Sequence, residues 1–193
     1  MRICIYGASG DRLDARYFEA ARALGKELGR RGHSLVFGGG AHGLMGACAE
    51  GAASAGAEIV GIAPRFFDEP GIRYAGCTRF VWTDSMRERK AAMEDAAEAF
   101  VVLPDGIGTL EEFFETLTLK QLGQHGKPIA LLNTLGYFDA LRVLLEQAAE
   151  GGFMSRRCLA LCAFCTAPGD ALDHVEAAPP LTGGLTRLED YTK

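Results

Sequence analysis

Three short glycine-rich segments carry the residues best suited to bind a ligand. Residues 6–10 read Tyr-Gly-Ala-Ser-Gly, residues 37–46 begin Phe-Gly-Gly-Gly, and residues 105–112 read Asp-Gly-Ile-Gly-Thr-Leu-Glu-Glu. Glycine lets the backbone approach a ligand closely, and backbone amides at the start of a helix bind anions. These segments therefore predict contact with a phosphate or another anionic group.

The third segment offers the fullest set of groups. An apolar strand would turn through Gly106 and Gly108 into a helix that begins at Thr109, so loop amides, the Thr109 hydroxyl and the positive helix end would form an anion site. Glu112 would lie about 5 Å along the helix axis from that site. It could equally cap the helix start, and the sequence alone leaves both roles open.

The first two segments permit more than one interpretation. Ser9 could offer its hydroxyl to a ligand, or it could belong only to a tight turn. Gly38, Gly40 and Gly43 fit the dinucleotide-binding pattern G-x-G-x-x-G. That pattern normally follows the first strand, and an acid ends the next one, whereas here it follows the second and the acid is missing. We therefore expect a phosphate or nucleotide cradle that includes Gly39 and Gly40, not an NAD site.

A cluster of cations lies between the second and third segments. Arg87, Arg89 and Lys90 fall within four residues at the start of a predicted helix, where the helix dipole disfavours positive charge. Such runs usually face solvent. This helix, however, follows a strand at 79–82 and starts at the same rim as the glycine segments, so we expect these cations to serve an anionic ligand.

No metal or cofactor site is expected. Cys158, Cys162 and Cys165 have the spacing of a radical iron–sulfur enzyme, but a strand there would turn Cys162 and Cys165 to opposite faces, which favours buried structural thiols. The four histidines are dispersed, without the spacing of metal ligands.

Alternating strands and helices must position these segments. Apolar runs occur at 2–6, 34–37, 58–62, 79–82, 99–103, 128–132 and 161–165, and helical patterns at 14–31, 43–55, 85–97, 109–122, 137–150 and 168–176. Apolar strands separated by helices are typical of a parallel sheet covered on both faces. We predict an α/β fold: a Rossmann-like doubly wound parallel sheet with helices on both faces, which binds its ligand at the carboxyl ends of the strands.

Length and charge restrict the class of protein. The 193 residues suit one domain, at 1–176, followed by a C-terminal tail at 177–193. A net charge of −5 without a basic block argues against nucleic acid or a membrane surface as partner. Without a long apolar run or a signal-peptide pattern, a cytoplasmic location is expected.

Residues 37–46, 87–93 and 104–112 together resemble the signatures of the Lonely Guy family, the cytokinin riboside 5′-monophosphate phosphoribohydrolases, many of which were labelled possible lysine decarboxylases. The hallmark of that family is P-G-G-x-G-T-x-x-E, preceded by Arg-Lys in an M-H-E-R-K context. The resemblance covers about residues 1–176 in element order. It implies a homodimeric hydrolase that cleaves the N-glycosidic bond of nucleoside 5′-monophosphates without a cofactor.

The resemblance also implies roles for particular residues. Arg89 and Glu112 match the catalytic arginine and the catalytic acid. Substrate contacts are implied at Glu69, Lys90, Gly106, Ile107, Gly108, Thr109, Leu110 and Thr118. Two positions depart from the hallmark, with Asp105 in place of its first glycine and Arg87 in place of its histidine. A carboxylate at position 105 would repel a phosphate unless it faced away.

Other functions remain open at this stage. The chain could be an AMP-preferring nucleosidase or a non-catalytic protein that binds nucleotide phosphates. A pyridoxal-phosphate decarboxylase would need a Schiff-base lysine, and no lysine motif supports one. Met93, Phe113 and Phe114 would form either a dimer face or part of the core.

Overall fold

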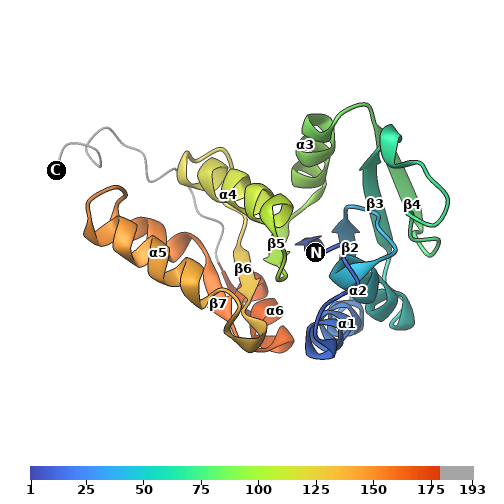
Figure 1. The fold of residues 1–193 in the computed structure, drawn as a ribbon, viewed down its shortest axis with the longest axis horizontal. Coiled ribbons are helices and arrows are strands. Elements are labelled where there is room, and N and C mark those ends of the chain that lie inside the picture. Colours follow the sequence, from blue (N-terminus) through green and yellow to red (C-terminus); the bar gives the residue numbers. More distant parts are fainter. Residues whose placement is uncertain (179–193) are drawn as a thin grey trace.

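A seven-stranded parallel sheet forms the centre of the protein (Figure 1). The computed structural model describes residues 1–178. The strands are β1 (Arg2–Tyr6), β2 (Ser34–Phe37), β3 (Ile59–Pro64), β4 (Arg79–Thr83), β5 (Ala99–Val102), β6 (Ile129–Leu132) and β7 (Ala163–Cys165). Their order is β4-β3-β2-β1-β5-β6-β7, and every neighbouring pair is parallel. The predicted doubly wound parallel sheet is therefore confirmed.

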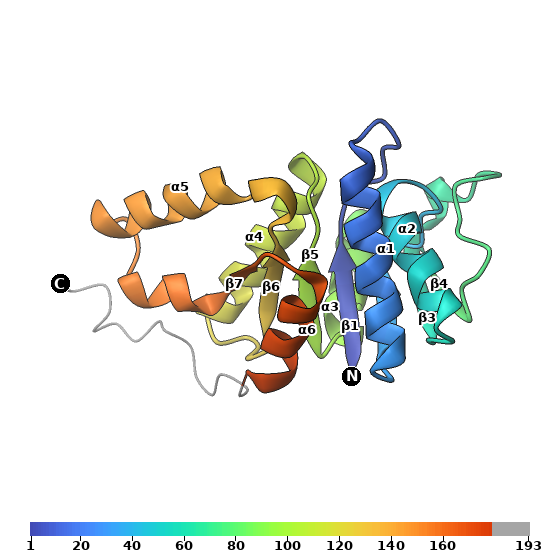
Figure 2. The same ribbon diagram turned by 90° about the horizontal axis from the view of Figure 1, so that it is seen from below.

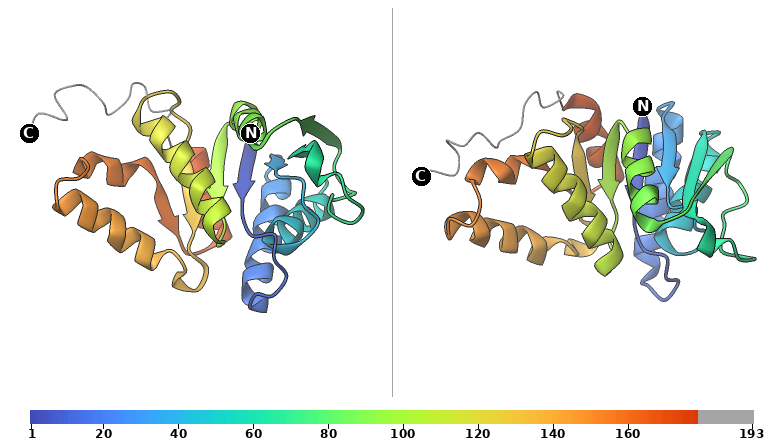
Figure 3. Two further views of the ribbon diagram at one scale, coloured as in Figure 1. Left: turned by 45° about the horizontal axis from the view of Figure 1, so that its top comes forward. Right: turned by 90° about the horizontal axis from the view of Figure 1, so that it is seen from above.

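Helices cover both faces of the sheet. They are α1 (Ala15–Arg30), α2 (Gly43–Ser54), α3 (Met86–Ala96), α4 (Ile107–Gln121), α5 (Asp139–Glu150) and α6 (Pro168–Ala177). One core joins α1, α2 and α6 to the sheet, and a second core joins α3 and α4 to it. Helix α5 extends outward beyond β6 and β7 (Figures 2 and 3).

The strand order reverses beside β1. The chain builds β1 to β4 outward on one side, then returns to place β5 on the other side of β1. Connections that leave β1 and β5 toward opposite faces open a crevice at the carboxyl ends of these strands, which is where ligands bind in such sheets. The segments after β1, β2 and β5 are the three glycine-rich segments of the sequence.

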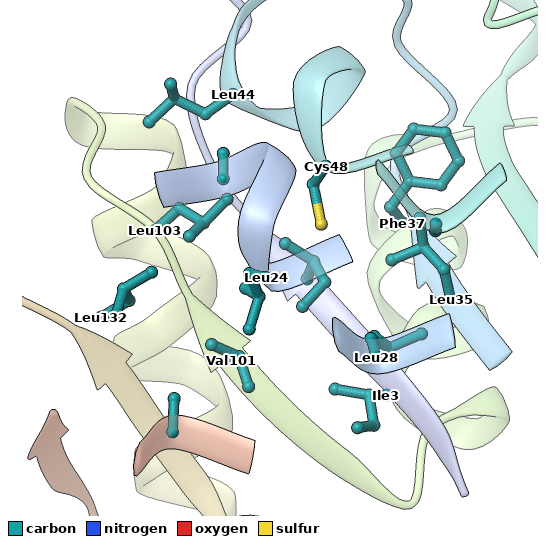
Figure 4. Packing of buried hydrophobic residues seen from close by; sticks show 14 of the residues in the cluster. Ile3, Leu24, Leu28, Leu35, Phe37, Leu44, Cys48, Val101, Leu103 and Leu132 are labelled. Atoms are coloured by element: carbon teal, nitrogen blue, oxygen red, sulfur yellow. The ribbon is translucent and has the colours of Figure 1, made fainter. Parts of the chain in front are cut away.

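The strands are apolar on both sides because both sides are buried. Ile3 and Ile5 point into the core under α1 and α2, whereas Cys4 and Tyr6 point into the core under α3 and α4. Figure 4 shows the first core, in which Leu24 of α1 lies among side chains from the central strands. The continuous apolar runs of the sequence have this simple cause.

Glycine allows α1 and α2 to pack with their backbones close together. A Cβ atom built on Gly25 would lie 1.9 Å from the carbonyl oxygen of Cys48, and one built on Gly51 would lie 2.1 Å from that of Arg22. Each helix thus presents a glycine to the backbone of the other. This contact explains two glycines that serve neither a turn nor a ligand.

Some expected boundaries and exposures differ from the structure. Helix α4 begins at Ile107, not at Thr109, so Ile107 and Gly108 belong to its first turn. Met93 and Phe113 are fully buried, which places them in the core and not on a dimer face, while Phe114 is 38% exposed. The expected tail falls almost entirely at residues 179–193, outside the described residues.

Substitution of Gly25 by alanine tests the contact between α1 and α2. Alanine favours a helix by up to about 1 kcal/mol over glycine, but its Cβ would force the two helices apart. We expect a net loss of about 2 kcal/mol in the free energy of unfolding, measured by urea denaturation. Gly10→Ala is the control, because a Cβ there meets nothing within 4 Å. An increase in stability for Gly25→Ala would contradict the proposed packing.

Candidate active site

A cavity of about 440 Å³ lies at the carboxyl ends of β1 to β5. Its walls come from the segments after these strands and from the start of α3 and α4. The lining comprises Gly7, Ser9, Gly38, Gly39, Gly40, Ala41, His42, Met45, Ala63, Phe67, Ile72, Arg73, Phe80, Trp82, Met86, Arg89, Asp105, Gly108, Thr109, Glu111 and Glu112. The crevice predicted from strand order thus holds a cavity lined by all three glycine-rich segments.

A buried ion pair joins two of the lining residues. Nη1 of Arg89 donates a hydrogen bond to Oε1 of Glu112 at 2.7 Å, and the two side chains are only 10% and 9% exposed. Nε of Arg89 donates to the carbonyl oxygen of Ile62 at 3.4 Å. The two residues lie 23 positions apart in the chain, and their pair connects the N-terminal parts of α3 and α4.

Gly38 makes room for the Arg89 guanidinium. A Cβ built at position 38 would lie 2.3 Å from Nη2 of Arg89, so any larger side chain would displace the arginine. The G-x-G-x-x-G pattern suggested that this glycine approaches a phosphate. In the structure its evident role is to let the guanidinium lie against the backbone.

Burial changes the acidity of Glu112. Loss of hydration raises the pKa of this carboxyl above its ordinary value, and the guanidinium of Arg89 opposes that effect without cancelling it. A carboxyl group in this environment accepts a proton more readily than an exposed glutamate does. It can therefore accept and release a proton during a reaction in the cavity.

The first turn of α4 offers backbone amides to the cavity. Its N-cap is Gly106, which has no side chain to occupy them, and the first amides of a helix have no partner within the helix. Gly108 and Thr109 of this turn line the cavity. The hydroxyl of Thr109 donates to Oδ2 of Asp105 at 2.8 Å, so the carboxylate of Asp105 faces the helix start.

The start of α2 is occupied by the protein itself. The amide of Gly43 donates to Oδ1 of Asp11 at 2.8 Å, and the amide of Met45 donates to the carbonyl oxygen of Ala8 at 3.2 Å. His42 contacts the other oxygen of Asp11 at 3.1 Å. An anion entering the cavity therefore finds the amides of α4 available, while these two amides of α2 are already bonded.

Apolar and aromatic side chains form the opposite wall. The ring centroids of Phe80 and Trp82, both on β4, lie 4.6 Å apart, and Met45, Phe67 and Ile72 extend the same lining. The guanidinium of Arg73 lies over the Phe80 ring, 5.4 Å from its centroid. The sequence-based reasoning missed this wall, although alternate aromatic residues at a strand end were a signal for it.

The residues predicted from the sequence divide into two groups. Those that line the cavity are Ser9, Gly39, Gly40, Arg89, Gly108, Thr109 and Glu112. Those that do not line it are Glu69, Lys90, Gly106, Ile107, Leu110 and Thr118. Glu69 and Thr118 are exposed, as is Arg87, and Ile107 is 87% exposed.

Lys90 is engaged by two glutamates of α4. Its Nζ forms ion pairs with Glu111 and, at 2.6 Å, with Glu115. Although burial lowers the pKa of Lys90, these carboxylates raise it overall. This cation therefore joins α3 to α4 beside the Arg89–Glu112 pair.

Two kinds of feature are absent from the described part of the chain. Among residues 1–178, no group of three or more His, Cys, Asp and Glu side chains is placed to hold a metal ion. Over the same residues, no helix combines the length and apolar character needed to cross a membrane.

Known proteins resemble this chain in sequence and in fold. A family model described as "Possible lysine decarboxylase" matches residues 45–175. The cytokinin riboside 5′-monophosphate phosphoribohydrolase LOG of Oryza sativa subsp. japonica is 36% identical over 190 residues, which are 98% of this chain and 73% of that protein. The cytokinin riboside 5′-monophosphate phosphoribohydrolase LOG1 of Arabidopsis thaliana is 38% identical over 190 residues, which are 98% and 83% of the two chains.

A likeness to one solved structure concerns the fold alone. The molybdenum cofactor binding protein from Rippkaea orientalis matches with a TM-score of 0.70 at 19% identity, over 91% of this chain and 95% of that chain. The arrangement of strands and helices is thus shared with a protein of a different described role.

Replacement of Arg89 by methionine tests the buried ion pair. The carboxylate of Glu112 would lose its cation, and we expect a loss of about 3 kcal/mol in the free energy of unfolding at pH 7.5. An acid whose pKa is higher in the folded state destabilises the fold when ionised, so the loss should shrink as the pH falls and Glu112 is protonated. Urea denaturation at pH 7.5 and pH 5.0 measures both values.

The double variant Arg89→Met, Glu112→Gln is the control. It has no carboxylate to titrate at position 112, so Arg89→Met should gain stability relative to it as the pH falls from 7.5 to 5.0. An equal loss at both pH values in the single variant would show that the electrostatic explanation is wrong.

Proposed function

We propose that this chain, which belongs to the Lonely Guy family of possible lysine decarboxylases, hydrolyses the N-glycosidic bond of nucleoside 5′-monophosphates. The products are the free base and ribose 5-phosphate. The observation that carries the proposal is the buried Arg89–Glu112 pair, which lines a cavity between free helix amides and an aromatic wall. The two plant relatives bear the name of this activity.

The two ends of the cavity suit the two ends of a nucleotide. The 5′-phosphate binds at the first turn of α4, where the amides of Gly108 and Thr109 and the helix dipole favour an anion. The base lies against Phe80 and Trp82, because aromatic faces stack on bases. The sugar then spans the middle of the cavity, beside Glu112.

Glu112 performs the chemistry on the sugar. Cleavage passes through a state in which the sugar ring carries positive charge, as in other glycoside hydrolyses. The bond between C1′ and the base nitrogen breaks, and its electron pair leaves with the base, which takes up a proton from solvent. A water oxygen bonds to C1′ while its proton passes to Glu112, and the carboxylate stabilises the developing positive charge. Glu112 later returns to solvent the proton that it accepts from the attacking water.

Arg89 orients Glu112 and limits the rise of its pKa. The hydrogen bond from Nη1 fixes Oε1 of the carboxylate, so the other oxygen, Oε2, is presented to the substrate in one orientation. Holding the reacting groups in register contributes several kcal/mol to catalysis. The guanidinium is in turn fixed by its close approach to Gly38 and by its hydrogen bond to the carbonyl oxygen of Ile62.

The aromatic wall favours a large, partly apolar base. Met45, Ile72 and Trp82 give room for an apolar substituent on adenine, as an isoprenylated AMP would carry. AMP itself is the alternative substrate. We also propose a cytoplasmic location, since cysteines such as the half-buried Cys77 remain free thiols in a reducing compartment.

We further propose that two copies of the chain associate. Val143 and Leu144 of α5 and Phe153 after it are 45%, 57% and 89% exposed, and α5 extends away from the sheet (Figure 2). Large apolar side chains exposed to water favour association.

Replacement of Glu112 by glutamine tests the catalytic assignment. The substitution keeps the size of the side chain but removes the proton acceptor and the negative charge near C1′. We expect the release of adenine from AMP, and of base from isopentenyl-AMP, to fall about 10³-fold. Chromatography of the free base measures this rate.

Glu146→Gln is the matched control, because it removes the same charge from the exposed side of α5. Its rate should equal that of the wild type. A Glu112→Gln variant within tenfold of the wild-type rate would contradict the assignment. Wild-type protein that binds AMP without releasing base would instead be a nucleotide-binding protein.

Charge introduced on α5 tests the homodimer. We expect the wild type to sediment with the mass of two chains, and Leu144→Glu with Phe153→Glu to sediment as one, because charged side chains are not accommodated in an apolar interface. Leu13→Glu alters an exposed leucine elsewhere and should leave the dimer intact. A monomeric wild type at micromolar concentration would disprove the proposal.

A further inference from the structure

The side chain of Asp105 is held inside the cavity by the protein itself. Its Oδ2 accepts the hydroxyl hydrogen of Thr109 at 2.8 Å, and Thr109 is 3% exposed. The hydroxyl of Tyr137 donates to the backbone carbonyl of Asp105, which fixes the other end of the residue. The carboxylate therefore faces the first turn of α4.

The carboxylate of Asp105 has a different kind of partner from the other carboxylates in the lining. Glu112 is paired with Arg89, and Glu111 is paired with Lys90. Asp105 is bonded instead to a neutral hydroxyl, and no described residue forms an ion pair with it. Its negative charge reaches Glu112, whose pKa is raised first by burial, then by Glu111 and last by Asp105.

A phosphate at the start of α4 would meet this charge directly. It would lie beside a carboxylate that no cation neutralises, and it would have to compete with Asp105 for the hydroxyl of Thr109. At the dielectric of a protein surface, repulsion between two like charges a few ångströms apart weakens the binding of the charged ligand by about tenfold or more. A neutral hydroxyl in the same place escapes this repulsion.

We propose that Asp105 is a specificity-determining residue that weakens the hold of this site on a 5′-phosphate, so that the chain accepts unphosphorylated nucleosides nearly as well as nucleoside 5′-monophosphates. This inference rests on the proposed function, because it assigns the phosphate to the first turn of α4. It adds a second substrate class, the nucleosides, to the same site.

Binding of two non-hydrolysable ligands tests the inference. Carbocyclic AMP and carbocyclic adenosine have a carbon ring in place of the sugar, so neither can be cleaved, and they differ only in the phosphate. Calorimetry at pH 7.5 gives the ratio of their dissociation constants. We expect wild-type protein to prefer the phosphorylated ligand by less than tenfold, and Asp105→Asn to increase that preference at least tenfold.

The asparagine variant keeps an acceptor for Thr109 while removing the charge, so the fold of the loop is retained. Binding of carbocyclic adenosine should change less than twofold, and the gain for carbocyclic AMP should diminish in 0.5 M salt because screening weakens the repulsion. Asp95→Asn removes a charge from the exposed side of α3, outside the cavity lining, and should leave the ratio unchanged.

Two results would overturn the inference, and they differ in what they say of the proposed function. An equal ratio in the wild type and in Asp105→Asn would refute the role of Asp105 and leave the hydrolase proposal standing. Failure of both ligands to bind in every variant would refute both.

Discussion

The candidate site depends on one constraint: Arg89 and Glu112 must meet in a place almost without water. Removing two charges from water costs several kcal/mol for each ion, and the attraction between them offsets this only when the geometry is good. The geometry comes from the sheet. Helix α3 follows β4 at one edge and α4 follows β5 beside β1, and the N-terminal parts of both helices lie at the carboxyl ends of the strands, where Arg89 meets Glu112.

The same constraint explains residues that contact no ligand. Gly38 must lack a side chain so that the guanidinium fits against the backbone after β2. The carbonyl oxygen of Ile62, at the end of β3, accepts the remaining hydrogen bond from Nε of Arg89. Lys90 forms a second connection between α3 and α4 through Glu111 and Glu115. Four strands and two helices thus contribute to the position of a single carboxylate.

The fold and the main elements of the site could be predicted from the sequence. Runs such as residues 99–103 are apolar at every position, which requires burial on both faces and hence a parallel sheet with helices on each side. The strand ends then had to carry the ligand site, and the glycine-rich segments stood at those ends. Contacts between distant segments could not be predicted in this way. Periodicity says nothing of a glycine that accommodates an arginine 51 residues later in the chain.

The two helix starts at the cavity show why local patterns were insufficient. The sequence presents a glycine-rich segment before both α2 and α4, and each alone favours an anion site. Asp11, from the segment after β1, bonds the amide of Gly43 and thereby satisfies the start of α2. At α4 the acid is Asp105, which bonds the side chain of Thr109 and leaves the amides of the first turn facing the cavity. Which amides remain available is therefore decided by tertiary contacts of two aspartates, and that difference determines where in the cavity a negative charge can be held.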